Sequence, residues 1–347
     1  MKTSISSTTS KHISMTRTIH PVGQGAFYSE TFSYDDSARF TAVYDCGGKV
    51  DTLSQEIDKL ARVDVVFISH FHCDHINRLK VLNDKYKPKD VVFPHISTCH
   101  FLVDFVFNCI KMEGGCGTFM LRFLPVLRLA NSGNGDSLII DGTRYTPVKR
   151  IHRYLFPYES ALWEYISFNR ENDFKEQKLC KKLLPLFGMS ADSLDKYNDE
   201  PFYEEIAKRL REDEHLLEKV KNIYSYSFPG GHNSYSMPVL SHQIDKDKIE
   251  DKKFDCLYTG DVNVDNWVLD IASTYKPDYI QVPHHGSNYN HNPYLYKSNN
   301  IVFVSVGITN RYRHPGLITL PYIINTCKEV HVVTEDATTV FSRSIQF

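Results

Sequence analysis

The 347-residue sequence contains no run of 18 apolar residues, so no membrane-spanning helix is expected. It also lacks CxxC pairs, and its eight cysteines follow no regular spacing, which is typical of reduced thiols in a cytosolic protein. The formal net charge is only -2, so charge alone neither indicates nor excludes a nucleic-acid partner. We therefore expect a cytoplasmic protein without a membrane partner.

The composition is that of a globular protein. Apolar residues make up 41% of the chain and charged residues 24%, so a sizeable core can be buried. The first 17 residues lack the apolar segment of a secretory signal, and we expect residues 1–17 to be a flexible tail. Residues 18–347 are expected to form one domain.

Short apolar runs separated by turns occur in both halves of that domain. They include Val63–Ser69 in the first half and Ile301–Val306 in the second. Between residues 99 and 221 apolar residues instead recur at helical spacing, which predicts a mostly helical insertion or cap. The aromatic residues between Tyr154 and Phe168 are expected to form the core of this cap; the alternatives are a lid over the site and a dimer surface. The pattern indicates strands and helices layered around one core.

The segment His70-Phe71-His72-Cys73-Asp74-His75 follows directly after the Val63–Ser69 run. It therefore lies at the carboxyl end of a predicted buried strand, where α/β proteins place their active sites. Three imidazoles and a carboxylate within six residues are a metal-binding set that suits zinc, with manganese or iron as alternatives. The sequence predicts a metal site in this loop.

Further candidate ligands follow in order along the chain. His232 lies in a glycine turn, Asp261 follows the apolar run 256–258, and His284 and His285 follow the run 279–282. Each is next to a turn at a predicted strand end. Because the carboxyl ends of neighbouring strands meet at one edge of a sheet, we expect these side chains to converge on the same site.

The order Asp45, His-x-His-x-Asp-His, His232, Asp261 and His284-His285 resembles the signature of the metallo-β-lactamase superfamily. The resemblance implies an α/β fold, the αββα sandwich, with a helical insertion added here. It also implies two divalent metal ions, with zinc as the expected metal, and a hydrolytic reaction that uses a metal-activated hydroxide.

The same resemblance implies a role for each residue. One metal would be held by His70, His72 and His232, the other by Asp74, His75 and one member of the His284-His285 pair, with Asp261 bridging both. A histidine directly before glycine favours His285 as the ligand, which leaves His284 facing the substrate. Asp74 or Asp261 would orient the attacking water, and Asp45 would orient a ligand histidine.

Smaller motifs are similar to those of the competence-related, DNA-uptake subgroup, which is associated with phosphodiester cleavage. In the segment Asn310–Pro315, His314 would contact a phosphate, and Arg311 and Arg313 would neutralise it. The chain departs from this subgroup at His72, where the uptake proteins often carry aspartate, and in its long insertion.

Three functions stay open from the sequence. The first is a metal-dependent phosphodiesterase or nuclease that acts on nucleic acid or a nucleotide. The second is a hydrolase of a small ester, thioester or lactone. The third is a metal-binding scaffold that engages a protein partner, or a second copy of the chain, through the helical insertion.

Overall fold

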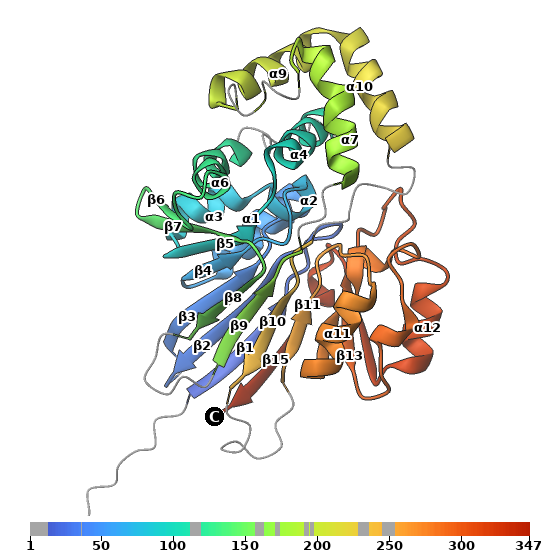
Figure 1. Cartoon of the computed structure of the whole chain (residues 1–347). Coiled ribbons are helices and arrows are strands. Elements are labelled where there is room, and N and C mark those ends of the chain that lie inside the picture. Colours follow the sequence, from blue (N-terminus) through green and yellow to red (C-terminus); the bar gives the residue numbers. More distant parts are fainter. Residues whose placement is uncertain are drawn as a thin grey trace, which may run out of the picture.

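The computed structural model describes residues 13–35, 37–111, 119–156, 163–170, 174–190, 194, 198–227, 236–244 and 254–347. Its strands form two sheets, each covered by helices on its outer face (Figure 1). This arrangement confirms the predicted α/β sandwich.

The first sheet has eight strands in the order β15-β1-β2-β3-β4-β5-β7-β6. Their bounds are Ile13–Ile19 for β1, Tyr28–Tyr34 for β2, Ser37–Tyr44 for β3, Val65–Phe67 for β4, Asp90–Pro94 for β5, Leu138–Ile140 for β6, Thr143–Val148 for β7 and Phe341–Gln346 for β15. Strands β3, β4, β5 and β7 run parallel, so their carboxyl ends lie at one edge.

The second sheet has seven strands in the order β14-β13-β12-β11-β10-β9-β8. Their bounds are Ile151–Leu155 for β8, Trp163–Phe168 for β9, Val239–Gln243 for β10, Cys256–Tyr258 for β11, Tyr279–Gln281 for β12, Ile301–Ser305 for β13 and Glu329–Val333 for β14. Strands β11 to β14 run parallel, which again collects their carboxyl ends at one edge.

Alternating side chains explain why such short apolar runs form the centre of the sandwich. In β4, Val65 and Phe67 lie in the cluster between the sheets, whereas Val66 lies in the cluster beneath the helices. In β13, Phe303 faces the other sheet and Val302 faces the outer helices. A strand buried on both faces has to be apolar at every position, which is the pattern in the sequence.

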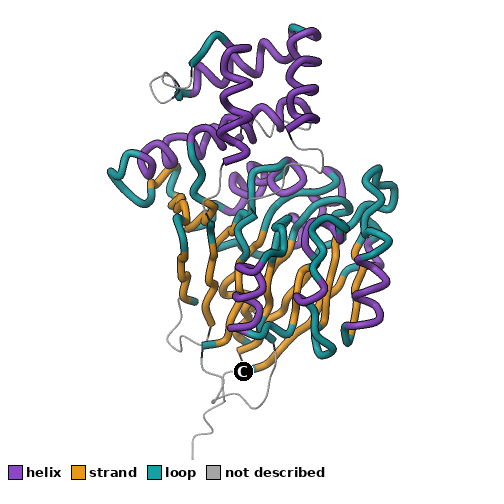
Figure 2. The backbone as a smooth tube through the Cα atoms, turned by 45° about the vertical axis from the view of Figure 1, so that its right-hand side comes forward, coloured by secondary structure: helices purple, strands orange, loops and turns teal. Residues whose placement is uncertain are grey.

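Helices cover both outer faces. Those associated with the first sheet are α1 (Val50–Lys59), α2 (Cys73–Ile76), α3 (Leu79–Tyr86), α4 (Thr98–Lys111) and α6 (Leu124–Asn131). The second sheet is covered by α11 (Asn266–Tyr275) and α12 (Thr319–Thr326). A further tier consists of α7 (Phe174–Leu183), α9 (Glu200–Glu212) and α10 (Glu214–Ser227). This tier packs on α4 and stands beyond the strands (Figure 2).

The predicted insertion 99–221 is not one helical block. It contains strands β6 to β9, which complete an edge of each sheet, as well as the helical tier. The aromatic residues expected to form the cap core lie elsewhere: Trp163 and Tyr165 on β9 are buried between the two sheets. Alternation along β9 sends Phe168 to the opposite face, beneath the outer helices.

The predicted flexible tail 1–17 is wrong at its end, because residues 13–17 belong to β1. Arg17 is fully buried between the sheets, where its Nε donates to Glu30 Oε1 at 2.8 Å. Its terminal nitrogen also donates to the Phe254 carbonyl at 2.8 Å. A single arginine in a polar stretch gives no sign of this pairing, because one partner lies on β2 and the other in the segment just before β11.

Candidate metal centre

The centre begins where β3 and β4 end side by side. Asp45 follows β3 and Ser69 follows β4, and the parallel register places them in contact. The backbone N–H of Ser69 donates to Asp45 Oδ1 at 2.7 Å, and the Ser69 hydroxyl donates to Asp45 Oδ2 at 2.7 Å. Helix α2 then turns His75 back, so that its Nδ1 lies 2.7 Å from the same Oδ2. Asp45 therefore orients a candidate ligand histidine.

Gly47 allows the two loops to touch. A Cβ at this position would lie 2.1 Å from the carbonyl carbon of Asp74. The neighbouring Cys46 N–H donates to the His75 carbonyl at 2.8 Å. Only glycine allows the two loops to come this close, because any side chain at position 47 would push Asp74 and His75 out of place.

The second sheet supplies its candidate ligands in the same way. Asp261 follows β11, where its N–H donates to the Ser236 hydroxyl at 2.6 Å. His284 and His285 follow β12, and both adopt left-handed backbone angles, with φ of 47° and 51°. Such strain in two consecutive non-glycine residues is typical of functional sites. His285 is fixed by Nδ1, which donates to the Ser305 carbonyl at the end of β13 at 2.8 Å.

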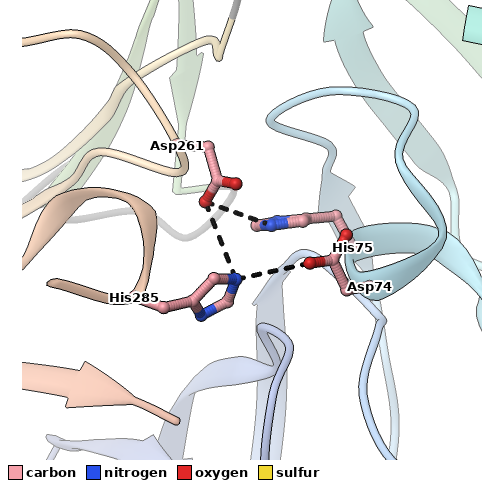
Figure 3. A group of neighbouring side chains, drawn as sticks. All are labelled: Asp74, His75, Asp261 and His285. Carbon is pink, nitrogen blue, oxygen red and sulfur yellow. Dashed lines mark ion pairs between the residues drawn. The ribbon is translucent and has the colours of Figure 1, made fainter. Parts of the chain in front are cut away.

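Four of these side chains meet at one point (Figure 3). One ligand atom each from Asp74, His75, Asp261 and His285 lies within 4.8 Å of the others. His75 Nε2 is 3.3 Å from Asp261 Oδ1, and His285 Nε2 is 3.4 Å from Asp74 Oδ2. The structure thus brings together residues that are separated by as many as 211 positions in the chain.

His70 lies beside this group, with its Nε2 3.9 Å from Asp261 Oδ2. Its Nδ1 lies 2.9 Å from the hydroxyl of Ser69. Because that hydroxyl gives its only proton to Asp45, it accepts from His70, so that Nδ1 carries the hydrogen of the neutral ring. Nε2 of His70 then keeps its lone pair directed at the cluster.

The donor set fits a divalent cation. Nε2 of His70, His75 and His285 is buried and makes no hydrogen bond within the described parts of the chain. Each of these rings is held at Nδ1, so each presents Nε2, and two carboxylates stand among them. Imidazole nitrogens and carboxylate oxygens are the ligands that zinc prefers in hydrolytic sites.

The electrostatics of the cluster also favour a cation. Although burial opposes the charged ring, Asp261 and Asp45 raise the pKa of His75 well above its usual value. Burial would raise the pKa of Asp261, but the neighbouring histidines lower it well below its usual range. Burial lowers the pKa of His70, and His75 and His72 lower it further, so His70 is neutral. A neutral imidazole is the form that binds a metal.

The remaining predicted ligands lie around this group. His284 Nε2 is 3.6 Å from Asp261 Oδ2, and its Nδ1 is 2.7 Å from Asn290 Oδ1. His72 packs against the ring of His70, with 4.5 Å between centroids. His232, with its glycine turn, lies outside the described residues.

The segment 310–315 lies at the edge of the cluster. The His314 ring centroid is 5.5 Å from that of His284 and stacks on Tyr312 at 5.9 Å. Burial, together with the nearby His284 and His285, lowers the pKa of His314 to about 4. The Tyr312 hydroxyl accepts hydrogen bonds from Arg311 at 2.9 Å and from Lys111 at 3.0 Å.

Two residues of α4 that lie close to the candidate site were not predicted from the sequence, Asp104 and Lys111. Lys111 reaches Tyr312 from 201 positions away in the chain. Asp104 Oδ1 lies 3.9 Å from His72 Nε2. Asp104 does carry one local signal, because it is the one carboxylate in a mostly apolar helix.

A cavity of about 430 Å³ opens beside Asp74. Its lining includes the charged side chains of Lys49 and Glu335 and the amide side chains of Gln24, Asn77 and Asn310. The Asp74 side chain is 35% exposed, whereas that of Asp261 is 2% exposed. Asp74 is therefore the carboxylate of the cluster that solvent or a bound molecule can reach.

One stretch of the chain matches a known protein-family model. Residues 36–106, which include β3, β4 and the His70–His75 loop, match the family model of the metallo-beta-lactamase superfamily. A search of curated proteins found no match. The family match supports a metallo-beta-lactamase superfamily fold; membership of the competence-related subgroup stays a prediction.

Solved structures with similar chain paths share little sequence with this protein. The metallo-beta-lactamase fold protein YhfI from Bacillus subtilis is 9% identical, with a TM-score of 0.46 over 96% of this chain and 100% of that one. Igni18, a metallo hydrolase from Ignicoccus hospitalis, is 10% identical, with a TM-score of 0.45 over 96% and 99%. An isothiocyanate hydrolase from Delia radicum gut bacteria is 9% identical, with a TM-score of 0.43 over 96% and 100%. None of these likenesses assigns a substrate to this chain.

Among the described residues, no helix has the length and apolar character needed to cross a membrane.

Proposed function

We propose that the protein is a metal-dependent hydrolase that cleaves phosphodiesters. The observation that carries the substrate class is the cationic rim beside the cluster, formed by Lys111 and Arg311. Lys111 and Arg311 converge on the Tyr312 hydroxyl, and Tyr312 stacks on His314 next to His284. Guanidinium and ammonium groups around a metal cluster suit an anionic phosphoryl group better than a neutral ester.

The metals would be held by His70, His72, Asp74, His75, Asp261 and His285, together with His232. When bound, they would supply a Lewis acid for the phosphoryl oxygen and would lower the pKa of an attacking water.

The protein groups would divide the remaining tasks. Asp74, the accessible carboxylate, would accept a hydrogen bond from the attacking water and so orient it. His284, whose Nδ1 is held by Asn290, would present Nε2 to the substrate. His314 is neutral at pH 7, since its pKa is about 4, and would contact a phosphate oxygen as a hydrogen-bond donor. The cationic rim would offset the charge of the phosphodiester.

The test compares two substrates on the same protein. Zinc- or manganese-loaded protein should hydrolyse bis-p-nitrophenyl phosphate faster than p-nitrophenyl butyrate. Asp74→Ala combined with His75→Ala should abolish cleavage, and intact cleavage in that variant would contradict the proposed site. Digestion of single- and double-stranded DNA, RNA and cyclic dinucleotides would then identify the class of the natural substrate.

One observation favours the second candidate, hydrolysis of a small ester, thioester or lactone. The 430 Å³ cavity beside Asp74 has one cation, Lys49, and two anions, Glu335 and Asp74 itself. Such a lining does not select an anionic substrate. Preference for the butyrate ester in the same assay would support this candidate over the phosphodiester.

A further inference from the structure

Helix α4 carries a polar stripe that its apolar sequence does not require. His100, Asp104 and Asn108 are spaced four residues apart, so they lie on one face of the helix. They are 3%, 2% and 3% exposed, respectively. Burying a carboxylate and two further polar groups is costly unless each meets a partner.

The stripe contacts the metal-binding loop. Asn108 Nδ2 donates to the Phe71 carbonyl at 2.6 Å. One turn earlier, Asp104 Oδ1 lies 3.9 Å from His72 Nε2, an ion-pair distance. The ring of Phe107, from the same helix, packs on the His72 ring with 4.6 Å between centroids. Helix α4 therefore holds the loop at two consecutive residues, 71 and 72.

The other cluster histidines indicate what a carboxylate at this place does. His75 is held at Nδ1 by Asp45, and His285 is held at Nδ1 by the Ser305 carbonyl. In each ring the held nitrogen carries the hydrogen, and the opposite nitrogen faces the cluster. Groups that orient ligand histidines in this way are a regular part of metal sites.

We propose that Asp104 is the positioning residue for His72. The carboxylate attracts the Nε2–H of His72, so that Nδ1 would be the nitrogen presented to a metal. His100 holds the other carboxylate oxygen, with its Nε2 3.3 Å from Asp104 Oδ2. Asp104 would thus orient His72 through an ion pair at 3.9 Å, whereas Asp45 orients His75 through a contact at 2.7 Å. Asp104 lies on the helix that also supports the helical tier. This inference rests on the proposed metal-dependent function.

The experiment measures zinc binding rather than turnover. Metal-free full-length protein is titrated with zinc in competition with a chromogenic chelator, and its melting temperature is recorded without metal. Asp104→Asn should weaken one of two zinc sites by about 10- to 100-fold and leave the other within about twofold. Asp104→Glu, which keeps the carboxylate, should recover part of the lost affinity.

A double-mutant cycle separates a role of Asp104 in positioning His72 from a role in packing of the helix. In a His72→Ala background, Asp104→Asn should cause no further loss of zinc affinity, because the ring that it orients is gone. Asp90→Asn is the matched control. Asp90 is a carboxylate of similar burial on β5 that pairs with Arg144 and Tyr154. The Asp90→Asn variant should melt at a lower temperature than the wild type and bind zinc with the same affinity.

The outcomes distinguish the two proposals. Wild-type protein that binds no divalent metal would overturn the proposed function and this inference with it. Wild-type protein that binds two zinc ions, with Asp104→Asn binding both equally well, would overturn the inference alone. Equal weakening of both sites, with a lower metal-free melting temperature, would also overturn it, since that result indicates general packing.

Discussion

Asp45 Oδ2 lies 2.7 Å from Nδ1 of His75, and both side chains are fully buried. The contact joins the end of β3 to α2, and two hydrogen bonds from Ser69 tie the end of β4 to the same carboxylate. It orients a candidate ligand histidine and anchors the loop that also carries His70, His72 and Asp74. The centre is therefore held in place by the sheet rather than by flexible loops alone.

Replacement of Asp45 by alanine should destabilise the metal-free protein by about 3–5 kcal/mol, because it leaves a buried histidine without its acceptor. Asp45→Asn should cost less, since an amide oxygen can still accept from the Ser69 N–H. Urea unfolding measures both values. If the two variants unfold at the wild-type midpoint, the anchoring role is wrong.

Gly47→Ala should disrupt zinc binding as well as stability. The added Cβ would meet the backbone of Asp74, which cannot yield without moving two ligands. Gly142→Ala is the control: its φ of +84° makes alanine strained, but no atom lies within 4 Å of the added carbon. The control should lose about 1 kcal/mol of stability and retain normal zinc affinity. Zinc titration and urea unfolding of both variants separate the two effects.

Loss of the cationic rim should affect anionic substrates selectively. Lys111→Ala combined with Arg311→Ala should lower kcat/KM for bis-p-nitrophenyl phosphate by roughly tenfold, the lower end of the range for a charge-assisted hydrogen bond. Hydrolysis of a neutral ester should change little. Arg343→Ala removes an exposed cation that pairs with Glu329 on β14 and serves as the control. A double variant that behaves like this control would remove the main support for a phosphodiester substrate.

Chelation should lower the thermal stability of the loaded protein. A ligand that binds only the folded state stabilises it by about 4 kcal/mol when present at about 1,000 times its dissociation constant. Zinc-loaded protein should therefore melt at a higher temperature than protein treated with a chelator, and zinc should restore the difference. Differential scanning calorimetry measures the shift, and identical melting curves would argue against a metal centre.

Stability should fall as the pH is lowered from about 8 to 5, partly through His20. Burial lowers the pKa of His20 below the ordinary 6.5, despite its hydrogen bond with Glu56. The folded state therefore resists protonation of this ring, whereas the unfolded chain accepts it below about pH 6.5. The stabilising contribution is present above that pH and is lost as the pH falls through the lowered value.

The pH effect can be isolated with His20→Asn in metal-free protein. The difference in unfolding free energy between wild type and variant should be largest near pH 8 and should shrink toward pH 5. A constant difference across this range would show that His20 does not contribute to the pH dependence.

The sequence by itself determined the ligand types and the positions where they occur. The His70–His75 loop follows an apolar run that is buried on both faces, and Asp261 and His285 also follow strand ends. These features are local, since hydrophobic patterning places the strands and parallel strands gather their carboxyl ends at one edge. The order of these motifs was therefore sufficient to expect that distant candidate ligands lie together.

Only the tertiary structure decided which nitrogen each histidine presents and which outside groups hold it. Nothing in the local sequence indicates the partners of Asp104 or Lys111, which both belong to α4. Only the packing of this helix places Asp104 beside His72 and Lys111 beside Tyr312. The same limit explains the wrong end of the predicted tail, because Arg17 finds its partners on β2 and in the segment before β11. Side-chain pairing across the fold depends on contacts between segments far apart in the chain. The periodicity of apolar residues along the sequence does not predict these contacts.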